Sequence, residues 1–413
     1  MPGCISLLDQ RRTTRRALLA RAAGLAAMPM LSRSAVAQKG DFPAATSPDV
    51  DSGDAHQRLR DMLALLPQDV LLSPVDGGLH FDWLDYQRQF AALGVDDPYD
   101  RSVEIVRYTM PLASSDPLFM HAMTEEIEEL LGFLPFNVHQ VLVAGTPPEM
   151  YSLYRGGVEF SSLTDIWEAS DYALVSSAHG EYWSTSPDAS VDFDNPLHRF
   201  VLARMNNMAI IDDDTLVCAP TAPMIERVLE LHATGGESAA DSEMIVPLVD
   251  AMPAETVNVM AFPGGTFSRA GVIPPNITPS ALEALDRLFE ESDEAIGPMP
   301  PLLSALAGVT AGVMAPPRNG KDDAGMSDAT AFMSFLAASE DDAVQAANTA
   351  FWRIDNLESL NTGEPYTDLL EVTNVAREAA NGPVMNVELG AGSAMRGVWH
   401  RLVMNRDLLP FAW

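Results

Sequence analysis

The feature that most constrains the fold is an alternation of extended and helical patterns over residues 138–219. Between its second and third extended segments, the helical spacing of Leu163, Ile166 and Trp167 predicts a short amphipathic helix. Two strands, a helix and two more strands predict an open sheet with a helix on one face, which is an α+β layer. The extended segments cover residues 139–145, 150–157, 172–186 and 209–217.

A looser version of the same order follows in the C-terminal part of the chain. A helix from Asp341 through Trp352, with Phe351 expected on its apolar side, separates two pairs of extended segments. We therefore expect an α+β protein of two similar antiparallel sheet-plus-helix units, with internal duplication as a hypothesis. If the units are repeats, residues 138–219 should superpose on 308–404 with their helices aligned. The extended segments here cover residues 307–315, 329–338, 384–389 and 397–404.

Further helices and strands are expected around these two units. Asp116 before Pro117 is typical of a helix start, and Gly132 is typical of a helix end, so one continuous helix is expected between them. The other expected helices cover residues 55–66, 81–93, 221–234 and 278–289, and the other expected strands cover 103–110 and 256–262.

The first 37 residues have the features of an export signal. Arg15 and Arg16 precede a segment rich in Ala and Leu, and Ala35 and Ala37 form a small-x-small cleavage site. The apolar segment is shorter than the roughly twenty residues that a spanning helix needs. It resembles a twin-arginine (Tat) export signal, and this resemblance implies cleavage after Ala37 and a periplasmic or extracellular mature protein.

With the signal set apart, the chain divides into five parts. Residues 1–37 form the export signal, and the polar, Pro-rich residues 38–54 predict a disordered leader. Residues 55–262 are expected to form the first α+β unit, and 302–413 the second. A connecting segment with a helix covers 263–301 and contains the punctuating run Gly-Pro-Met-Pro-Pro.

Cysteine content limits how the exported protein can be stabilised. Of the two cysteines, Cys4 lies in the signal and Cys218 would be alone in the mature chain, which excludes an intrachain disulfide. Stability must therefore come from a hydrophobic core, which about 376 residues can supply. No cysteine follows the apolar segment of the signal to carry a lipid, so we expect no stable membrane anchor after cleavage.

Charge excludes two classes of partner. Removing residues 1–37 would remove six of the 25 Lys and Arg and one of the 58 Asp and Glu, which leaves 19 against 57 and a formal net charge of −38. Such a surface repels nucleic acid and anionic lipid, so neither is an expected partner. Lys39 and Lys321 are the only lysines of the sequence. Both a GC-rich genome and adaptation to saline surroundings account for this composition.

Motifs for metals and cofactors are weak, so no cofactor and no metal ion is expected. Residues 390–395 resemble part of a dinucleotide-binding turn, but a hairpin turn accounts for them better because no helix and second strand can follow. Asp212, Asp213 and Asp214 could attract Ca²⁺, but a polar hairpin tip is expected at this position. Met120 and Met123 beside His121 could bind copper, but core packing is the better account.

No catalytic residues can be assigned from the sequence. The histidines show no ligand spacing, no nucleophile elbow or phosphate-binding loop is present, and the carboxylates are too numerous to single out a pair. We therefore expect a non-catalytic extracytoplasmic binding or assembly protein with an unknown small molecule or protein as its partner. A dispersed-site hydrolase or a cofactor-binding Tat-exported enzyme is the alternative, and a metal carrier is a third possibility.

The expected site lies in a cleft between the two units, because ligand pockets favour domain interfaces. Core burial is the alternative for every aromatic side chain expected near such surfaces, and these residues are Trp167, Tyr182, Trp183, Trp352 and Trp399.

Overall fold

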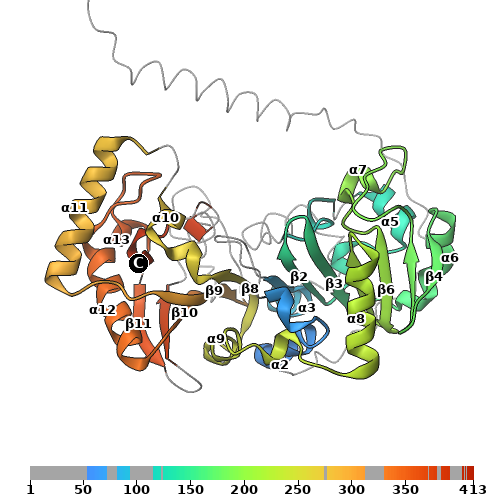
Figure 1. Cartoon of the computed structure of the whole chain (residues 1–413), viewed down its shortest axis with the longest axis horizontal. Coiled ribbons are helices and arrows are strands. Elements are labelled where there is room, and N and C mark those ends of the chain that lie inside the picture. The colour runs from blue at the N-terminus through green and yellow to red at the C-terminus, as the bar shows by residue number, and fades with distance from the viewer. Residues whose placement is uncertain are drawn as a thin grey trace, which may run out of the picture. The chain divides into compact units, whose positions relative to one another are not determined.

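Twelve strands of the described residues form one antiparallel sheet, with the order β11-β12-β10-β9-β8-β1-β2-β3-β7-β6-β5-β4 (Figure 1). The computed structural model describes residues 54–71, 81–93, 115–121, 124–273, 277–311, 330–370, 372–378, 383–390, 402–403, 405 and 407–413. The strands are β1 (Phe81–Asp85), β2 (Gln140–Thr146), β3 (Glu149–Arg155), β4 (Ala173–Ser176), β5 (Glu181–Ser184), β6 (Asn207–Asp212), β7 (Thr215–Ala219), β8 (Thr256–Pro263), β9 (Leu302–Thr310), β10 (Ala331–Ala337), β11 (Val372–Glu378) and β12 (Val384–Leu389).

Five strands of each half of the sheet follow the same order. Starting at the centre, the first half runs β1-β2-β3-β7-β6 and the second runs β8-β9-β10-β12-β11, and β5 and β4 extend the first half beyond this shared order. In each half, two hairpins meet through one strand of each, at β3–β7 and at β10–β12. The halves meet where Trp83 of β1 lies opposite Val259 of β8. A shared strand order alone does not demonstrate duplication, which stays a prediction.

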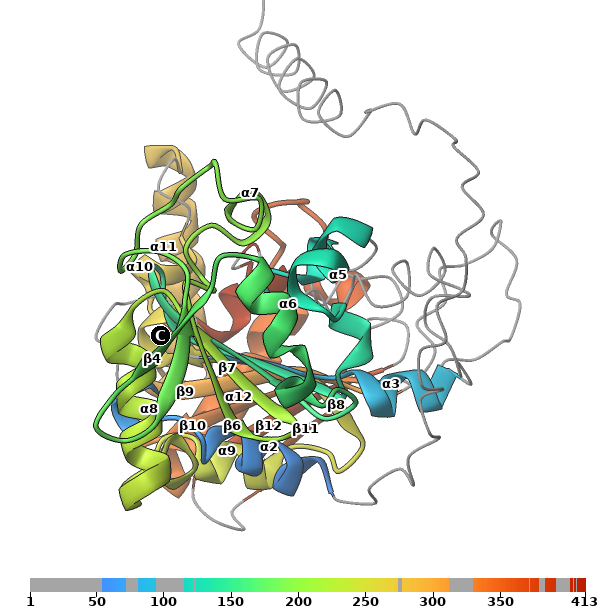
Figure 2. The ribbon, with the colours of Figure 1, turned by 90° about the vertical axis from the view of Figure 1, so that its right-hand side faces the viewer.

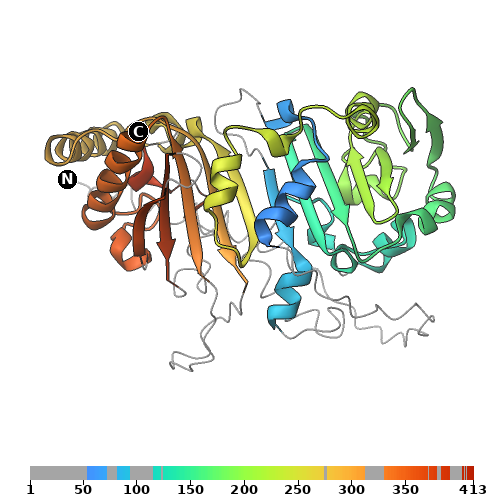
Figure 3. The ribbon, with the colours of Figure 1, turned by 90° about the horizontal axis from the view of Figure 1, so that it is seen from below.

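The helices cover both faces of the sheet, which confirms the α+β prediction. Figure 2 shows α5 and α6 above the strands and α2 and α9 below them, and Figure 3 shows α2 and α9 from below. The α-helices are α2 (Ala55–Leu63), α3 (Tyr86–Leu93), α5 (Glu125–Leu131), α6 (Thr164–Ala169), α7 (His198–Val201), α8 (Ala222–Thr234), α9 (Val246–Ala251), α10 (Arg269–Val272), α11 (Pro279–Ala295), α12 (Glu340–Asn356) and α13 (Tyr366–Leu369).

Each face of the sheet packs into its own hydrophobic core. Along β2, Val141 and Val143 enter the core that includes side chains of α5, α6, α11 and α12, which we call core 1. Leu142 and Ala144 enter the core under α2, α8 and α9, which we call core 2. Successive side chains of a strand point to opposite faces, so a strand buried on both sides becomes a continuous apolar run. The long helix α12 and the short helix α6 both pack on core 1.

Four expectations about individual elements were wrong. The first is a helix over residues 81–93, where the chain forms β1 and then α3. Every residue of β1 is buried, including Asp82 and Asp85, because the strand lies at the centre of the sheet. A strand that is buried on both faces loses the polar–apolar alternation by which strands are recognised, so an apolar spacing was mistaken for a helical one.

The second is a continuous helix over 117–131. A 3₁₀ turn covers Phe119–His121, and Thr124 is extended before α5 begins. The carboxylate of Asp116 accepts hydrogen bonds from the Leu118 amide (3.0 Å) and the Tyr154 hydroxyl (2.7 Å), so its capping bonds fix a tight turn in place of a longer helix. The expected helix end at Gly132 is confirmed by its left-handed backbone.

The third and fourth lie in the second half. Leu402 and Val403 are helical where a strand over 397–404 was expected, and both side chains pack into core 1. In α12, Phe351 points outward, and three of the six buried residues of the helix are alanines. The helix also begins one residue earlier than expected, with the Ser339 hydroxyl accepting the Asp342 amide at its start.

The described residues belong to one compact unit, which covers 47–413. Strand β8 pairs with β1 and with β9, so sheet pairing continues across the expected boundaries at 262/263 and 301/302, and these boundaries stay predictions. Within the described part of the chain, no helix combines the length and the apolar content needed to cross a membrane.

Candidate functional site

Helix α12 has an apolar stripe on the side away from the sheet. Asn348, Phe351, Trp352 and Asp355 follow each other at spacings of three, one and three, so they lie on one face of the helix. The Phe351 side chain is 53% exposed, and Trp352 is partly buried. The opposite face packs on core 1 through small residues such as Ala346. Neighbouring large apolar side chains at a surface form the kind of patch that interaction sites use.

A pocket of about 580 Å³ lies along this stripe. Three elements form its walls, namely the outer face of α12, the end of α11 and the strand β11. Figure 1 shows α11, α12 and β11 side by side at one end of the sheet, and residue contacts join α12 to both of the others. The lining residues are Ala295, Ile296, Ala347, Asn348, Phe351, Trp352, Asp355 and Val375.

A buried arginine joins the two helices behind the pocket. The guanidinium of Arg353 donates to Ser292 Oγ (2.9 Å), to Asp293 Oδ1 (3.2 Å) and to the carbonyl of Ala412. It also lies 4.6 Å from the centre of the Phe289 ring, which stacks against the guanidinium of Arg269 as well. Burial lowers the pKa of Arg353 to about 10, against the opposing effect of Asp293. The arginine therefore remains charged at physiological pH.

A glycine lets the end of α11 approach α12 closely. Gly297 has a φ of +109°, and a Cβ there would lie 2.6 Å from Gln345 Nε2. The same Gln345 amide donates to the carbonyl of Ile296 (3.0 Å), and Thr349 donates to the carbonyl of Gly297 (3.2 Å). These bonds satisfy carbonyls at the end of α11 that the helix itself cannot pair. The pocket wall at Ile296 is thus held by defined contacts.

A second group of residues with perturbed chemistry lies in core 1 of the first half. Asp82 on β1 lies opposite Val143 of β2, which lies opposite Ser152 of β3, and Ser152 lies opposite Cys218 of β7. Directly opposite residues of an antiparallel pair point to the same face. The register therefore brings a carboxyl, a hydroxyl and a thiol into one row of a mostly apolar layer.

Neutral donors hold the Asp82 carboxyl. It accepts the Ser115 amide (2.5 Å) and the Asn258 side-chain amide (3.3 Å). Burial raises the pKa of Asp82 to about 7, although these bonds oppose the shift and nearby Asp116 adds to it. Burial also raises the pKa of Asp116, while the bond from Tyr154 and the Arg204 guanidinium lower it.

The segment that carries Ser115 is tied to the sheet by Arg204. Its guanidinium donates to the carbonyl of Ser115 (2.7 Å) and to Ser152 Oγ (3.2 Å). Asp82 is only 1% exposed, and Asp116 and Cys218 are also buried. Burial raises the pKa of the Cys218 thiol well above its usual value, so the thiol is neutral and a weak nucleophile. This buried polar cluster has unusual titration, but a ligand in solvent has no direct access to its carboxyls.

The aromatic residues singled out from the sequence have different environments. Trp167, Tyr182 and Trp183 are buried, as the alternative of core burial predicted, whereas Trp352 lines the pocket. The pocket lies within the second half, and not between the halves where the site was expected. Trp399 and the signal residues Arg15, Arg16, Ala35 and Ala37 lie outside the described residues, as do Met123 and most of 390–395.

The acidic run at 212–214 takes the position expected of a hairpin tip. Asp212 ends β6, Thr215 begins β7, and Asp213 and Asp214 form the exposed turn between them. Among the described residues, no group of three or more His, Cys, Asp or Glu side chains is placed to hold a metal ion.

Sequence reasoning missed the two residues that matter most in these sites. Phe351 was assigned to the core, although its spacing from Asn348, Trp352 and Asp355 could have indicated a separate outer stripe. Asp82 was passed over as one carboxylate among many, and no sequence signal marks it as buried.

No known protein family, curated protein or solved structure matches this chain in sequence or fold. The site must therefore be interpreted from its own geometry.

Proposed function

We propose that this chain is exported through the Tat system and acts outside the cytoplasm as a non-catalytic binding protein, with its ligand bound in the pocket along α12. Export is supported by Arg15 and Arg16 before the apolar segment and by the cleavage motif at Ala35 and Ala37. Binding is supported by one observation above all, the outward stripe of Phe351 and Trp352 along a pocket of about 580 Å³.

The contacts behind the pocket support a preformed site. Arg353 is bonded to Ser292 and Asp293 of α11, so the two helices are held together without a ligand. Preformed walls reduce the ordering cost of binding, which favours a binding protein over a flexible surface. A dispersed-site enzyme remains the alternative, and the raised pKa of Asp82 supports it. The burial of that carboxyl weighs against contact with a substrate.

Export can be tested without knowing the ligand. Secreted material should begin at Gln38, because Ala35 and Ala37 are the small residues that the signal peptidase selects. Replacing both Arg15 and Arg16 with lysine should leave the protein in the cytoplasm. A membrane-bound product that begins at Met1 would contradict the export proposal, and N-terminal sequencing of fractionated cells measures the outcome.

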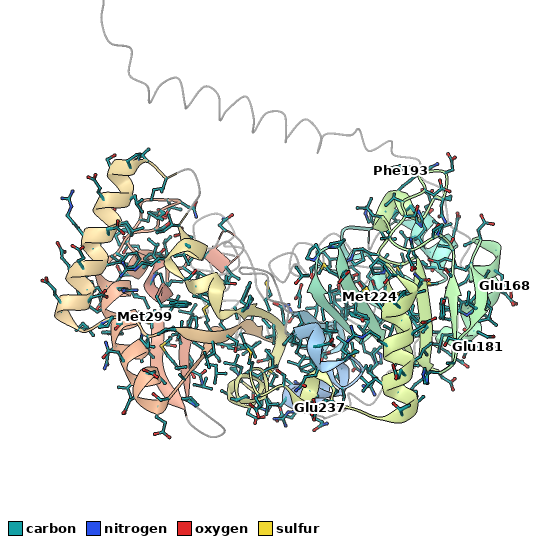
Figure 4. The ribbon with its side chains drawn as sticks, in the orientation of Figure 1. Glu168, Glu181, Phe193, Met224, Glu237 and Met299 are labelled. Atoms are coloured by element: carbon teal, nitrogen blue, oxygen red, sulfur yellow. The ribbon has the colours of Figure 1, made fainter. Side chains whose placement is uncertain are left out.

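Binding can be tested with the neutral dye Nile red, whose fluorescence rises in apolar pockets. Phe351→Ser should abolish dye binding to the native protein, because it removes the most exposed apolar wall. Phe193→Ser is the matched control, since Phe193 is 64% exposed but belongs to the first half (Figure 4). Equal loss in the two variants, or no binding by the wild type, would refute the pocket as the binding site. Thermal melts of the two variants should match the wild type.

A further inference from the structure

We infer that the ligand of this pocket is an organic cation with an apolar body, such as an amine or a quaternary ammonium compound. This inference rests on the proposed function and names the chemical class that the site would take. Three observations carry it: the aromatic wall, the helix ends that meet at the pocket, and the charges of the lining residues.

The aromatic wall suits a cation that is poorly hydrated. The faces of Trp and Phe rings carry negative electrostatic potential, and Trp binds cations best among the aromatic side chains. Phe351 and Trp352 both line the pocket, and Ile296 and Val375 add apolar surface for the rest of a ligand. A quaternary ammonium group combines charge with methyl groups, so it gains from both kinds of surface.

Helix α11 brings a negative helix end to the pocket. It ends at Ala295, and Ala295 and Ile296 form part of the lining. The C-terminal end of a helix carries a partial negative charge, which basic residues usually balance. The last turn of α11, which is fully described, contains no basic residue, and the exposed Glu294 adds a further negative charge.

Helix α12 brings an acidic residue to the other end of the pocket, in a last turn that also contains the buried Arg353. Asp355 lies one residue before the helix ends at Asn356, so its carboxylate lies near the negative end of the α12 dipole, which is unfavourable for an acid. Neither Asp355 nor Glu294 forms an ion pair with a described residue. The guanidinium of Arg353 balances these helix ends in part, and a bound cation would add to that balance at the pocket surface.

The lining excludes the other classes of charged ligand. None of its eight residues is basic, so an anion would find only negative charge and amide groups. The nearby guanidiniums of Arg353 and Arg269 are bonded to Asp293. A hard metal ion needs about six oxygen ligands, whereas Asp355 and Asn348 are the only lining residues with side-chain oxygens. The site therefore fits an organic cation.

The experiment compares three probes that share one benzyl body. Benzyltrimethylammonium carries the positive charge, neopentylbenzene replaces its nitrogen with carbon, and benzylsulfonate is an anion. Ligand-observed NMR on the mature protein should show the cation binding at least about tenfold more tightly than the neutral probe, with no binding of the anion. Equal binding of cation and neutral probe would overturn the cation inference and leave the proposed pocket intact. If no probe binds, the proposed function fails as well.

Two substitutions separate the pocket from the general negative charge of the protein. Asp355→Asn should weaken the cation about fivefold at low salt and leave the neutral probe unchanged. Phe351→Leu, which keeps an apolar side chain without the ring, should weaken the cation by a similar factor. Glu168→Gln on α6 is the matched control, because Glu168 is an exposed acid of the first half (Figure 4). An equal effect of Glu168→Gln and Asp355→Asn would show non-specific attraction and overturn the inference.

Discussion

Five strands of each half of the sheet share one order, but the buried charged groups Asp82 and Arg353, one from each half, have different kinds of partner. In the first half, the Asp82 carboxyl accepts hydrogen bonds from the amides of Ser115 and Asn258, which are neutral donors. In the second half, the Arg353 guanidinium is buried to the same 1% exposure but is bonded to the Asp293 carboxylate. The row of Asp82 continues into the second half through Met260, Ala307, Met333 and Val387, which are all apolar.

This difference predicts which of the two buried groups makes the stability of the protein depend on pH. An acid buried among neutral donors has a raised pKa, because burial penalises its charged form and no full opposite charge compensates. Arg353, with a pKa of about 10, keeps its charge throughout the range in which Asp82 titrates. We therefore expect Asp82 of the first half to change charge near neutral pH. Arg353 of the second half keeps its charge, so its contribution to the free energy of unfolding should not change over this range.

The largest expected effect is the pH response caused by Asp82. Its pKa is about 7 in the folded protein against 3.8 without burial, so the folded state binds the proton more tightly. The stability from this group is fully present below about pH 4 and is lost as the pH rises through about 7. About three pKa units correspond to roughly 4 kcal/mol. The contribution of Asp82 to the free energy of unfolding should therefore fall by about this amount between pH 4 and 8.

Asp82→Asn isolates this contribution, because the asparagine oxygen can still accept the Ser115 amide. The free energy of unfolding, measured in urea at a series of pH values, should increase for the variant relative to the wild type as the pH rises from 4 to 8. Burial also raises the pKa of Asp85 and Asp116, and both remain in the variant. Asp85 cancels in the difference, whereas Asp116 is coupled to Asp82, so the difference reports Asp82 together with its interaction with Asp116. A difference between the two proteins that does not change with pH would rule out the titration of Asp82.

The next largest effect should come from Arg353→Ala in the second half. The substitution removes the bonds to Ser292 and Asp293 and the stacking on Phe289, so it should cost about 3 kcal/mol. Asp293 is 29% exposed and retains its bond to Arg269, so it is not left alone in the core. Denaturant unfolding at pH 7 measures the loss.

Arg353→Lys is the control for charge. It keeps the positive charge but loses the planar fork that reaches several partners at once, so a clear loss of stability should remain. A lysine variant as stable as the wild type would show that the positive charge at this position stabilises the second half without the hydrogen bonds of the guanidinium. The contacts of Arg353 would then not distinguish the second half from the first.

Periodicity was sufficient to predict the elements with one buried face. Leu59, Met62, Leu63 and Leu66 repeat at helical spacing, and all four are buried in core 2, where α2 packs. The same reasoning predicted the strand at 256–262 and the hairpin tip at 212–214. For α2 and for the hairpin tip, local patterns carry this information because one side faces solvent. Strand β8 is buried along most of its length, and a short apolar run that ends at turn residues predicted it.

Elements without a solvent face could not be predicted in this way. Strand β1 is buried on both sides, and its partner β8 lies about 175 residues away, so no local pattern marks the pairing. The alanine side of α12 faces the sheet and its aromatic side faces outward, which reverses the usual assignment of large apolar residues to the core. The candidate site depends on that reversal and was therefore missed.

The smallest expected effect compares two acidic helices, one from each half. Glu126 lies in the first turn of α5, where a negative charge is favourable, and Glu294 lies in the last turn of α11, where it is unfavourable. Glu126→Gln should therefore destabilise the protein and Glu294→Gln should stabilise it, each by about 0.5 kcal/mol. Both side chains are exposed, so packing changes little. The full chain has a formal net charge of −33, and general repulsion would make the loss of either acid stabilising. Changes of opposite sign in the melting temperature would show that the position of the acid in its helix determines its effect on stability. Two increases would show that the net negative charge of the protein outweighs the helix dipole.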